Sequence, residues 1–302
     1  MVNNPYVNKV EYGNQTVMDI TDTTASPEKV FEGEVFYSRS GERQVGTYTC
    51  PLVKDNAGMH NSIYRGKSLG SSVSAAQWAA IAAGTFDDLF IGDYWTINSI
   101  TWRIAAFDYW LRTGDTECTT HHAVIVPDQN LLNADGSTTH YMNTSNTTAG
   151  GYAGSGFRSG TNADSSSNTA KATCKNKATS AFGSSHILTH RGYLTNAVTD
   201  GHASAGSWYD SDVELMNEKM VYGCEIFEPA ANGTVIPAKY TVDKCQLPLF
   251  AHDPSKITNR AHWWLRDVVS ASNFAFVGYY GHALYSSASS AWVGVRPAFA
   301  IK

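Results

Sequence analysis

The chain has 302 residues, of which 42% are hydrophobic, 12% aromatic and only 16% charged, the composition of a folded protein with a substantial core. A formal net charge of −5 and the lack of any Lys/Arg cluster argue against a nucleic-acid partner. No apolar run is long enough to span a bilayer and no export signal is legible at the N-terminus, so we expect no membrane insertion.

The cysteine pattern argues against a disulfide framework or a metal finger. The five cysteines are scattered without CxxC spacing, and an odd number cannot pair completely. Free cysteine is among the most buried residue types. We therefore expect mostly reduced, buried thiols in a protein folded in a cytosol: Cys50, Cys118, Cys174, Cys224 and Cys245.

Residues 1–47 contain short β-prone pieces separated by Gly, Asn and Pro. This is too little chain to build a robust core. We expect a small β-rich N-terminal module that packs on a neighbour or an oligomer partner, followed by a larger domain over residues 48–302.

The first clear helix is predicted from Ala75 to Ala83. Ser74 is the expected N-cap, Gln77 its capping-box partner, and Gly84 supplies the left-handed residue that ends the helix. Trp78 and Ile81 give the helix an apolar face.

Strands follow this helix. The segment at residues 86–110 reads as two β-rich runs joined around Asn98 and Ser99, which predicts a hairpin. The run HHAVIVPD at residues 121–128 is apolar enough for a central strand.

Residues 129–180 are rich in Asn, Ser, Thr and Gly. Such a sequence buries little apolar area against the entropic cost of ordering, so we expect a polar insertion of long surface loops or mobile chain. A weak helix is predicted at its end, around residues 165–181.

A second helix is predicted over residues 212–222. Ser211 and Glu214 have capping-box spacing, Gly223 can end the helix, and apolar residues repeat at helical spacing (Val213, Met216 and Met220). From there the chain alternates strands and turns to its end. The predicted fold class is α+β, with few helices and many short strands.

Catalytic and metal motifs are not evident. His121 and His122 are adjacent, so in a regular strand their rings point to opposite faces and cannot share one ion. Asp87, Asp88 and Asp93 lack a Ca²⁺-loop pattern, and no nucleophile elbow, phosphate loop or dinucleotide fingerprint occurs. We expect no catalytic residue, metal or cofactor, although an enzyme with machinery spread over loops remains an alternative.

The most unusual segment is residues 268–293, VVSASNFAFVGYYGHALYSSASSAWV, which holds six aromatic residues, six serines and no charge. Some of its apolar residues suit buried strand positions. The combination of Tyr, Trp, Ser and Gly is typical of recognition loops, where rigid aromatic rings supply contact area and small residues adapt.

This segment and its flanks resemble the variable proteins of diversity-generating retroelements. The resemblance rests on a frame of the type WLR(D)xxSAxxFAxVxxxGxAxxxxASxxxxGVRPAF, carried here by Trp264, Leu265, Arg266, Ser270, Ala271, Phe274, Ala275, Val277, Gly281, Ala283, Ala288, Ser289 and residues 294–299. In that family, template adenines are randomised during reverse transcription and written into the target gene. The resemblance implies a C-type-lectin-like fold related to the formylglycine-generating-enzyme type.

The resemblance also implies that the residues between the frame positions bind ligand. If they derive from asparagine codons with both adenines randomised, Lys, Glu, Gln, Met and Trp are unreachable, and only Trp292 departs from this rule. The implied binding positions are Asn273, Phe276, Gly278, Tyr279, Tyr280, His282, Leu284, Tyr285, Ser286, Ser287, Ser290, Ala291, Trp292 and Val293.

Residues 8–47 are similar to a short module of tail-fibre and tail-tip proteins from phages of Gram-positive gut bacteria. Together the resemblances imply a non-enzymatic receptor-binding protein of a virion tail, assembled as a homotrimer, that binds a bacterial surface protein or glycan. A structural protein that decorates the particle is the alternative. An enzyme of the formylglycine-generating type is disfavoured because the catalytic cysteine pair of those relatives is missing, and the EPN, QPD and WND motifs of Ca²⁺-dependent lectins are missing too.

Overall fold

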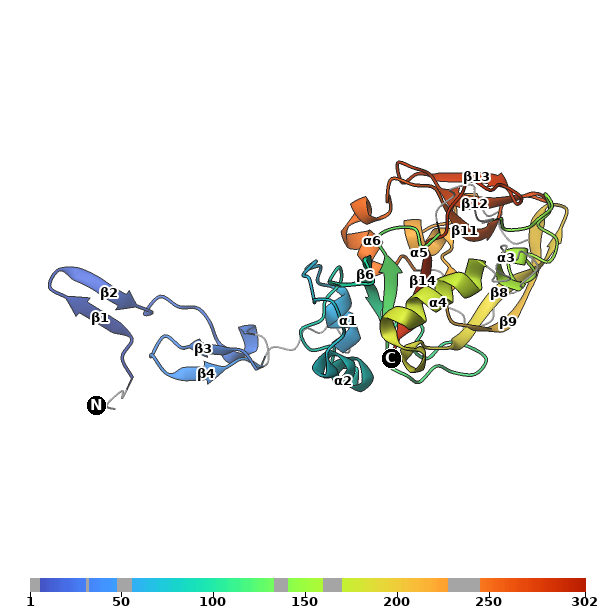
Figure 1. Ribbon diagram of the computed structural model, residues 1–302. Helices are drawn as coiled ribbons and strands as arrows, with labels where there is room; N and C mark the ends of the chain where they lie inside the picture. Colours follow the sequence, from blue (N-terminus) through green and yellow to red (C-terminus); the bar gives the residue numbers. More distant parts are fainter. Residues whose placement is uncertain (1–5, 31–32, 48–55, 133–140, 160–169, 228–244) are drawn as a thin grey trace. The chain divides into compact units, whose positions relative to one another are not determined.

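The computed structural model divides the chain into two compact units, Met1–Asp55 and Asn56–Lys302 (Figure 1). The boundary expected after residue 47 and the boundary found after Asp55 lie at the two ends of the segment 48–55. The structure describes residues 6–30, 33–47, 56–132, 141–159, 170–227 and 245–302.

The N-terminal unit consists of two hairpins and one turn of 3₁₀ helix. Its elements are β1 (Lys9–Tyr12), β2 (Gln15–Asp19), η1 (Pro27–Lys29), β3 (Val35–Tyr37) and β4 (Arg43–Val45), with β1 paired to β2 and β3 to β4, both antiparallel. Among its described residues only Gly46 is buried, and Tyr12 is 81% exposed. The described part of this unit therefore has no hydrophobic core.

The larger unit is built around a five-stranded antiparallel sheet in the order β10-β14-β7-β6-β5. β7 lies at its centre with all five residues buried, which confirms the central strand predicted there. The strands are β5 (Tyr94–Ile97), β6 (Ile100–Phe107), β7 (Ala123–Pro127), β10 (Glu214–Leu215) and β14 (Pro297–Ile301).

Two local predictions are confirmed in this unit. Asn98 and Ser99 join β5 to β6 with φ angles of 53° and 60°, the left-handed pair required by a type I′ hairpin turn. Helix α2 (Ala75–Ala83) starts at a complete capping box between Ser74 and Gln77 and ends at a left-handed Gly84.

Helices pack around the sheet. The remaining ones are α1 (Asn56–Asn61), α3 (Gly156–Ser159), α4 (Ala170–Phe182), α5 (Glu218–Tyr222) and α6 (Pro248–His252), with 3₁₀ turns η2 (Ser184–His186) and η4 (Pro254–Lys256). Phe182 at the end of α4 makes edge contacts with Trp95, Trp102 and Phe299 of the sheet. None of the helices in the described ranges is long and apolar enough to cross a bilayer.

The prediction of a helix over residues 212–222 is wrong at its start. The chain forms strand β9 (His202–Ser211), then β10, and only then α5, whose N-cap is Asn217. Glu214 caps no helix because its buried carboxylate binds Tyr152, Arg158 and Lys171. Tertiary partners outweigh the local capping signal there.

The polar insertion is not a set of surface loops where it is described. Met142, Tyr152 and Phe157 are buried, and α3 lies within it. The helix expected around residues 165–181 is found as α4, although residues 165–169 lie outside the described ranges. After α4 comes β8 (His190–Thr199), which forms a long antiparallel hairpin with β9.

A separate three-stranded antiparallel sheet in the order β11-β12-β13 lies at the top of the larger unit in Figure 1. Its strands are β11 (Trp263–Val268), β12 (Asn273–Val277) and β13 (Ala283–Ser287). The protein thus has the predicted α+β class, with few helices and many short strands.

Candidate functional site

The sheet β11-β12-β13 and the chain that follows β13 carry a group of exposed rings, here called the aromatic face. It consists of Tyr279, Tyr280, His282, Tyr285 and Trp292. The exposed fractions of the tyrosines are 39%, 76% and 53%, and that of Trp292 is 50%. Exposure of so many large rings within fourteen residues makes this surface the candidate ligand-binding site.

Each ring of the aromatic face contacts at least one neighbouring ring. Tyr279 and Tyr280 meet edge to face with ring centroids 5.0 Å apart, and Tyr280 stacks on His282 at 6.4 Å. Trp292 meets Phe276 and His262 edge to face, each at 5.1 Å. These contacts limit the rotamers of the rings, which lowers the entropy lost when a ligand binds.

The structure divides the fourteen implied binding positions by burial. Five are exposed and form the aromatic face. Six are half-buried: Asn273, Leu284, Ser286, Ser287, Ser290 and Ala291. Three are buried and present no side chain at the surface: Phe276, Gly278 and Val293.

The frame positions lie mainly on the interior side. Phe274, Ala275 and Val277 of β12 are fully buried, as are Trp264 and Leu265 of β11. Ala271 is an exception, being exposed. The same segment therefore supplies both the buried side chains of the sheet and the exposed rings.

The turn that presents Tyr279 and Tyr280 is tied down by hydrogen bonds. Gly278 donates its N–H to the carbonyl of His282 at 2.8 Å, and Gly281, with a φ of 87°, donates to the carbonyl of Gly278 at 2.8 Å. The hydroxyl of Thr258 donates to the carbonyl of Tyr279 at 2.7 Å. These hydrogen bonds fix the backbone of the turn, while the rings of Tyr279 and Tyr280 remain exposed to solvent.

Gly278 is closely covered by its neighbours. A Cβ at this position would lie 2.8 Å from Cε1 of His282 and 3.0 Å from Cδ1 of Leu284. Any side chain at residue 278 would displace the His282 ring from its present place.

Arg296 joins the end of β7 to the 3₁₀ turn η4. It is 1% exposed, and its guanidinium donates to the carbonyls of Pro127, Lys256 and Ile257 at 2.7, 2.9 and 3.1 Å. Its guanidinium carbon Cζ lies 5.2 Å from the Trp263 ring centroid. Burial lowers the pKa of this guanidinium to about 10, so Arg296 is still a cation at neutral pH.

Three residues outside the implied set contact the aromatic face. Arg260 lies over the Tyr279 ring at 5.9 Å, Phe227 meets the Tyr285 ring at 5.2 Å, and His262 packs between Phe276 and Trp292. Burial lowers the pKa of His262, and its Nδ1 has no hydrogen-bond partner. The sequence could have pointed to His262, which lies next to Trp263. No local sequence pattern points to Phe227.

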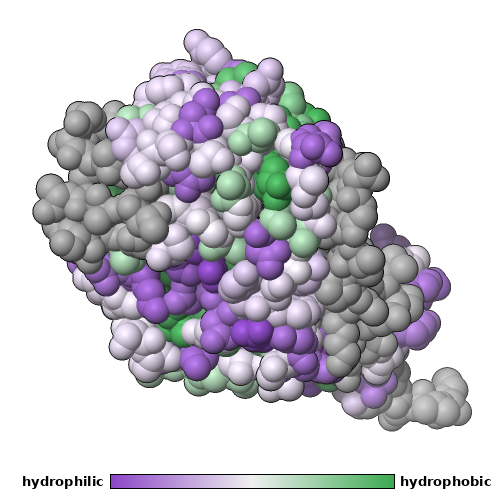
Figure 2. Space-filling model, turned by 90° about the vertical axis from the view of Figure 1, so that its right-hand side faces the viewer, coloured by the Kyte–Doolittle hydropathy of each residue, from purple (hydrophilic) through white to green (hydrophobic). Residues whose placement is uncertain are grey.

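Figure 2 shows the side of the larger unit that lies at the right of Figure 1. Its upper part, where β11, β12 and β13 lie in Figure 1, is mainly pale, and strongly hydrophilic residues are more frequent lower down. Residues 268–293 carry no charge. This surface is suited to a ligand that is bound by ring contacts and hydroxyl groups.

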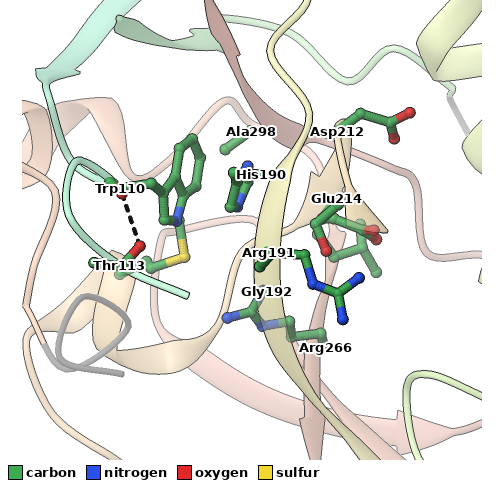
Figure 3. Close-up of a pocket in the computed structure, with 12 residues that line it drawn as sticks. Trp110, Thr113, His190, Arg191, Gly192, Asp212, Glu214, Arg266 and Ala298 are labelled. Atoms are coloured by element: carbon green, nitrogen blue, oxygen red, sulfur yellow. Dashed lines mark hydrogen bonds between the residues drawn. The ribbon is translucent and has the colours of Figure 1, made fainter. Parts of the chain in front are cut away.

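A small pocket elsewhere in the larger unit offers a second candidate site (Figure 3). His190 and Trp110 line it, stacked 4.1 Å apart, together with Arg191, Glu214 and Arg266. The Nδ1 atom of His190 is buried without a hydrogen-bond partner, and burial lowers the pKa of His190 to about 3.

The charged groups of this pocket are already paired. Arg191 binds Asp115 and Asp210, while Glu214 binds Arg158 and Lys171. A neutral imidazole with such a low pKa is a poor acid or base at neutral pH. The pocket supports no catalytic assignment and is best described as part of the polar core.

The histidine pair considered in the sequence has a structural role. His121 and His122 precede β7, and both contact Asp108: Nδ1 of His121 lies 2.7 Å from a carboxylate oxygen, and the backbone N–H of His122 donates at 2.9 Å. Nε2 of buried His122 accepts a hydrogen bond from the backbone of Trp110. Within the described ranges, no group of three or more His, Cys, Asp or Glu could bind a metal.

A family model described as "Domain of unknown function (DUF6273)" matches residues 196–302. The match covers about a third of the chain, from within β8 to the end of β14, and includes the whole aromatic face. No curated protein and no solved structure matches the chain. In its C-terminal third the chain is therefore similar to a family whose description names no function.

Proposed function

We propose that the chain is a ligand-binding protein whose aromatic face attaches a phage or prophage particle to a molecule on the surface of a bacterial cell. The observation that carries the proposal is the division of residues 268–293 by burial. Most frame residues of β11 and β12 are buried, whereas Tyr279, Tyr280, Tyr285 and Trp292 are exposed. Rigid aromatic anchors on a fixed scaffold are the arrangement that dominates binding energy at interfaces.

The phage context comes from the resemblance to retroelement variable proteins and to tail modules. In this proposal the larger unit is a C-type-lectin-like scaffold, the N-terminal unit belongs to a virion tail, and the assembly is a homotrimer. The exposed apolar side chains of the N-terminal unit, such as Tyr12 and Val17, support contacts with other chains. Several copies of the face would raise the avidity of an individually weak site.

The proposed function predicts loss of cell binding when the aromatic face is removed. Labelled full-length protein is titrated against a panel of Gram-positive gut strains, and a variant with Tyr279, Tyr280, Tyr285 and Trp292 changed to Ala is compared with it. We expect the apparent affinity to fall about 100-fold or more, since hot-spot aromatics each contribute roughly 2 kcal/mol.

The matched control changes Met59 and Ile63 to Ala, two exposed apolar residues outside the face, and should bind like the parent. Equal binding by the face variant and the parent would contradict the proposal. The retroelement origin is tested separately by sequencing around the gene. A neighbouring reverse transcriptase and a near-copy of the 3′ end that differs only opposite adenines are expected, and differences at other bases would exclude it.

The alternative of a protein that only decorates the particle predicts a different result. Such a protein would show no saturable binding to any strain, with or without the aromatic face. The two sites considered above lend no support to the enzyme alternative, because the charged groups of the pocket near His190 are paired with other side chains and His121 is bound to Asp108.

A further inference from the structure

Two cysteines lie at the surface of the larger unit. Cys118 and Cys174 are buried, as expected, but that expectation is wrong for Cys224 and Cys245, which are exposed free thiols. Cys224 follows α5 and Cys245 precedes α6. Twenty residues, 225–244, separate them in the sequence.

The chain on either side of Cys224 is bound to helix α5. Before it, left-handed Gly223 donates its N–H to the carbonyl of Lys219 at 2.9 Å and ends the helix. After it, the backbone N–H groups of Ile226 and Phe227 donate to the buried carboxylate of Glu218 at 2.8 and 3.0 Å. Cys224 is therefore positioned between two anchors on the same short helix.

The chain that contains Cys245 is bound to the same helix. Leu247 donates its N–H to the carbonyl of Met220 at 2.9 Å, and the side chain of Gln246 donates to the carbonyl of Val221 at 2.9 Å. The carbonyl of Cys245 itself accepts a hydrogen bond from the hydroxyl of Tyr109 at 2.6 Å.

The residues adjacent to the two cysteines touch each other. A Cβ built on Gly223 would lie 3.5 Å from the Cβ of Gln246. Each cysteine is one residue further along, a step of about 3.8 Å between Cα atoms. A disulfide requires Cα atoms roughly 4.4–6.8 Å apart, and the hydrogen bonds to α5 hold the two cysteine-bearing segments beside each other.

We propose that Cys224 and Cys245 form a reversible disulfide when the protein meets a disulfide oxidant such as oxidised glutathione. The thiolate of one cysteine attacks the oxidant, forming a mixed disulfide and releasing one reduced glutathione. The thiolate of the other cysteine then attacks the protein-bound sulfur, closing the bridge and releasing the second glutathione. The protein loses two electrons and two protons, and both protons leave on the glutathione thiols.

The bridge has a consequence for the neighbouring surface. Cys224 lies three residues before Phe227, whose ring packs against Tyr285. The bridge adds a covalent link between the segment that contains Phe227 and the chain that enters α6, beside the hydrogen bonds from the backbone of Ile226 and Phe227 to Glu218.

The test uses full-length protein with Cys50 changed to Ser, so that this thiol cannot compete. The reduced protein is exposed to oxidised glutathione, quenched with an alkylating agent and analysed by mass spectrometry without reductant. We expect the intact mass to fall by two hydrogen atoms, with loss of two alkylated thiols. A peptide map should identify one Cys224–Cys245 link, while buried Cys118 and Cys174 stay reduced.

Two single variants distinguish a bridge between the cysteines from separate oxidation of each thiol. Cys224→Ser and Cys245→Ser leave one exposed thiol each, and each should accumulate the mixed disulfide with glutathione instead of a bridge. If the protein with both cysteines accumulates two mixed disulfides and no bridge, the proposal is wrong. Cell binding plays no part in this readout, so failure here leaves the proposed function untouched, and failure of cell binding leaves the disulfide untouched.

Discussion

Strands β13 and β14 lie close together in the sequence but differ completely in their surroundings. All five residues of β14 are buried, whereas β13 has one exposed and four half-buried residues. β14 is an interior strand between β7 and β10, and β13 is an edge strand. Two strands that are close in the sequence thus differ in burial at every position. We therefore expect a substitution in β13 to lower the free energy of unfolding far less than a substitution in β14.

The largest effect is expected from removing the buried cation beside β14. Arg296→Met leaves the carbonyls of Pro127, Lys256 and Ile257 without their donor. Because buried unpaired polar groups each cost about 1–3 kcal/mol, we expect the free energy of unfolding to fall by about 3 kcal/mol or more. Denaturant titration measures it. Arg112→Met, at an exposed arginine, is the matched control and should change stability by less than about 0.5 kcal/mol.

The second change concerns an implied binding position that the structure places inside. Phe276 is 2% exposed and packs on Trp264 and Trp292. Phe276→Ala should lower the free energy of unfolding by about 3 kcal/mol, the usual cost of removing a buried phenyl ring. A loss below about 1 kcal/mol would mean that residue 276 belongs with the exposed positions.

Acid should destabilise the interior around His190. Burial lowers the pKa of His190 from 6.5 to about 3 in the folded protein, so between these values the unfolded chain binds the extra proton and stability falls as pH falls. From pH 7 to pH 5 this effect costs about 2 kcal/mol. His190→Phe retains the stacking on Trp110 and should weaken the pH dependence by roughly that amount, with exposed His202→Phe as control. An unchanged dependence would show that His190 is not the titrating group.

The smallest effects are expected on the face itself. Tyr280 is 76% exposed, so Tyr280→Ala should change the free energy of unfolding by less than about 0.5 kcal/mol. Trp292→Ala should cost about 1–2 kcal/mol, because half of this side chain is packed against Phe276 and His262. Thermal melting of both variants gives the ranking. Equal losses would mean that the Trp292 contacts add no stability.

The parts of the fold that could be predicted are those set by local chemistry. The capping box of α2, its left-handed Gly84 and the turn at Asn98 and Ser99 each depend on residues within four positions of one another. The false helix start at Glu214 shows the limit. Its carboxylate partners Tyr152, Arg158 and Lys171 are more than forty residues away, and no local pattern reports them.

The sequence pattern of residues 268–293 points to the segment that carries the exposed rings but not to the burial of Phe276, Gly278 and Val293. β12 is buried on both faces because Trp292 covers Phe276. Period-two alternation is therefore absent from the strand. Phe227 joins the face through a hydrogen-bonded turn on Glu218, a tertiary contact that the sequence cannot signal.

The tight packing around Gly278 limits which combinations of side chains the aromatic face could carry. Under the proposed function, residues 278, 282 and 284 are exchanged independently in the gene. In space they share one volume, since a Cβ at 278 would overlap the present positions of His282 and Leu284. Viable variants should therefore show correlated choices, with a larger residue at 278 accompanied by smaller ones at 282 or 284. The usable repertoire is smaller than the number of DNA combinations.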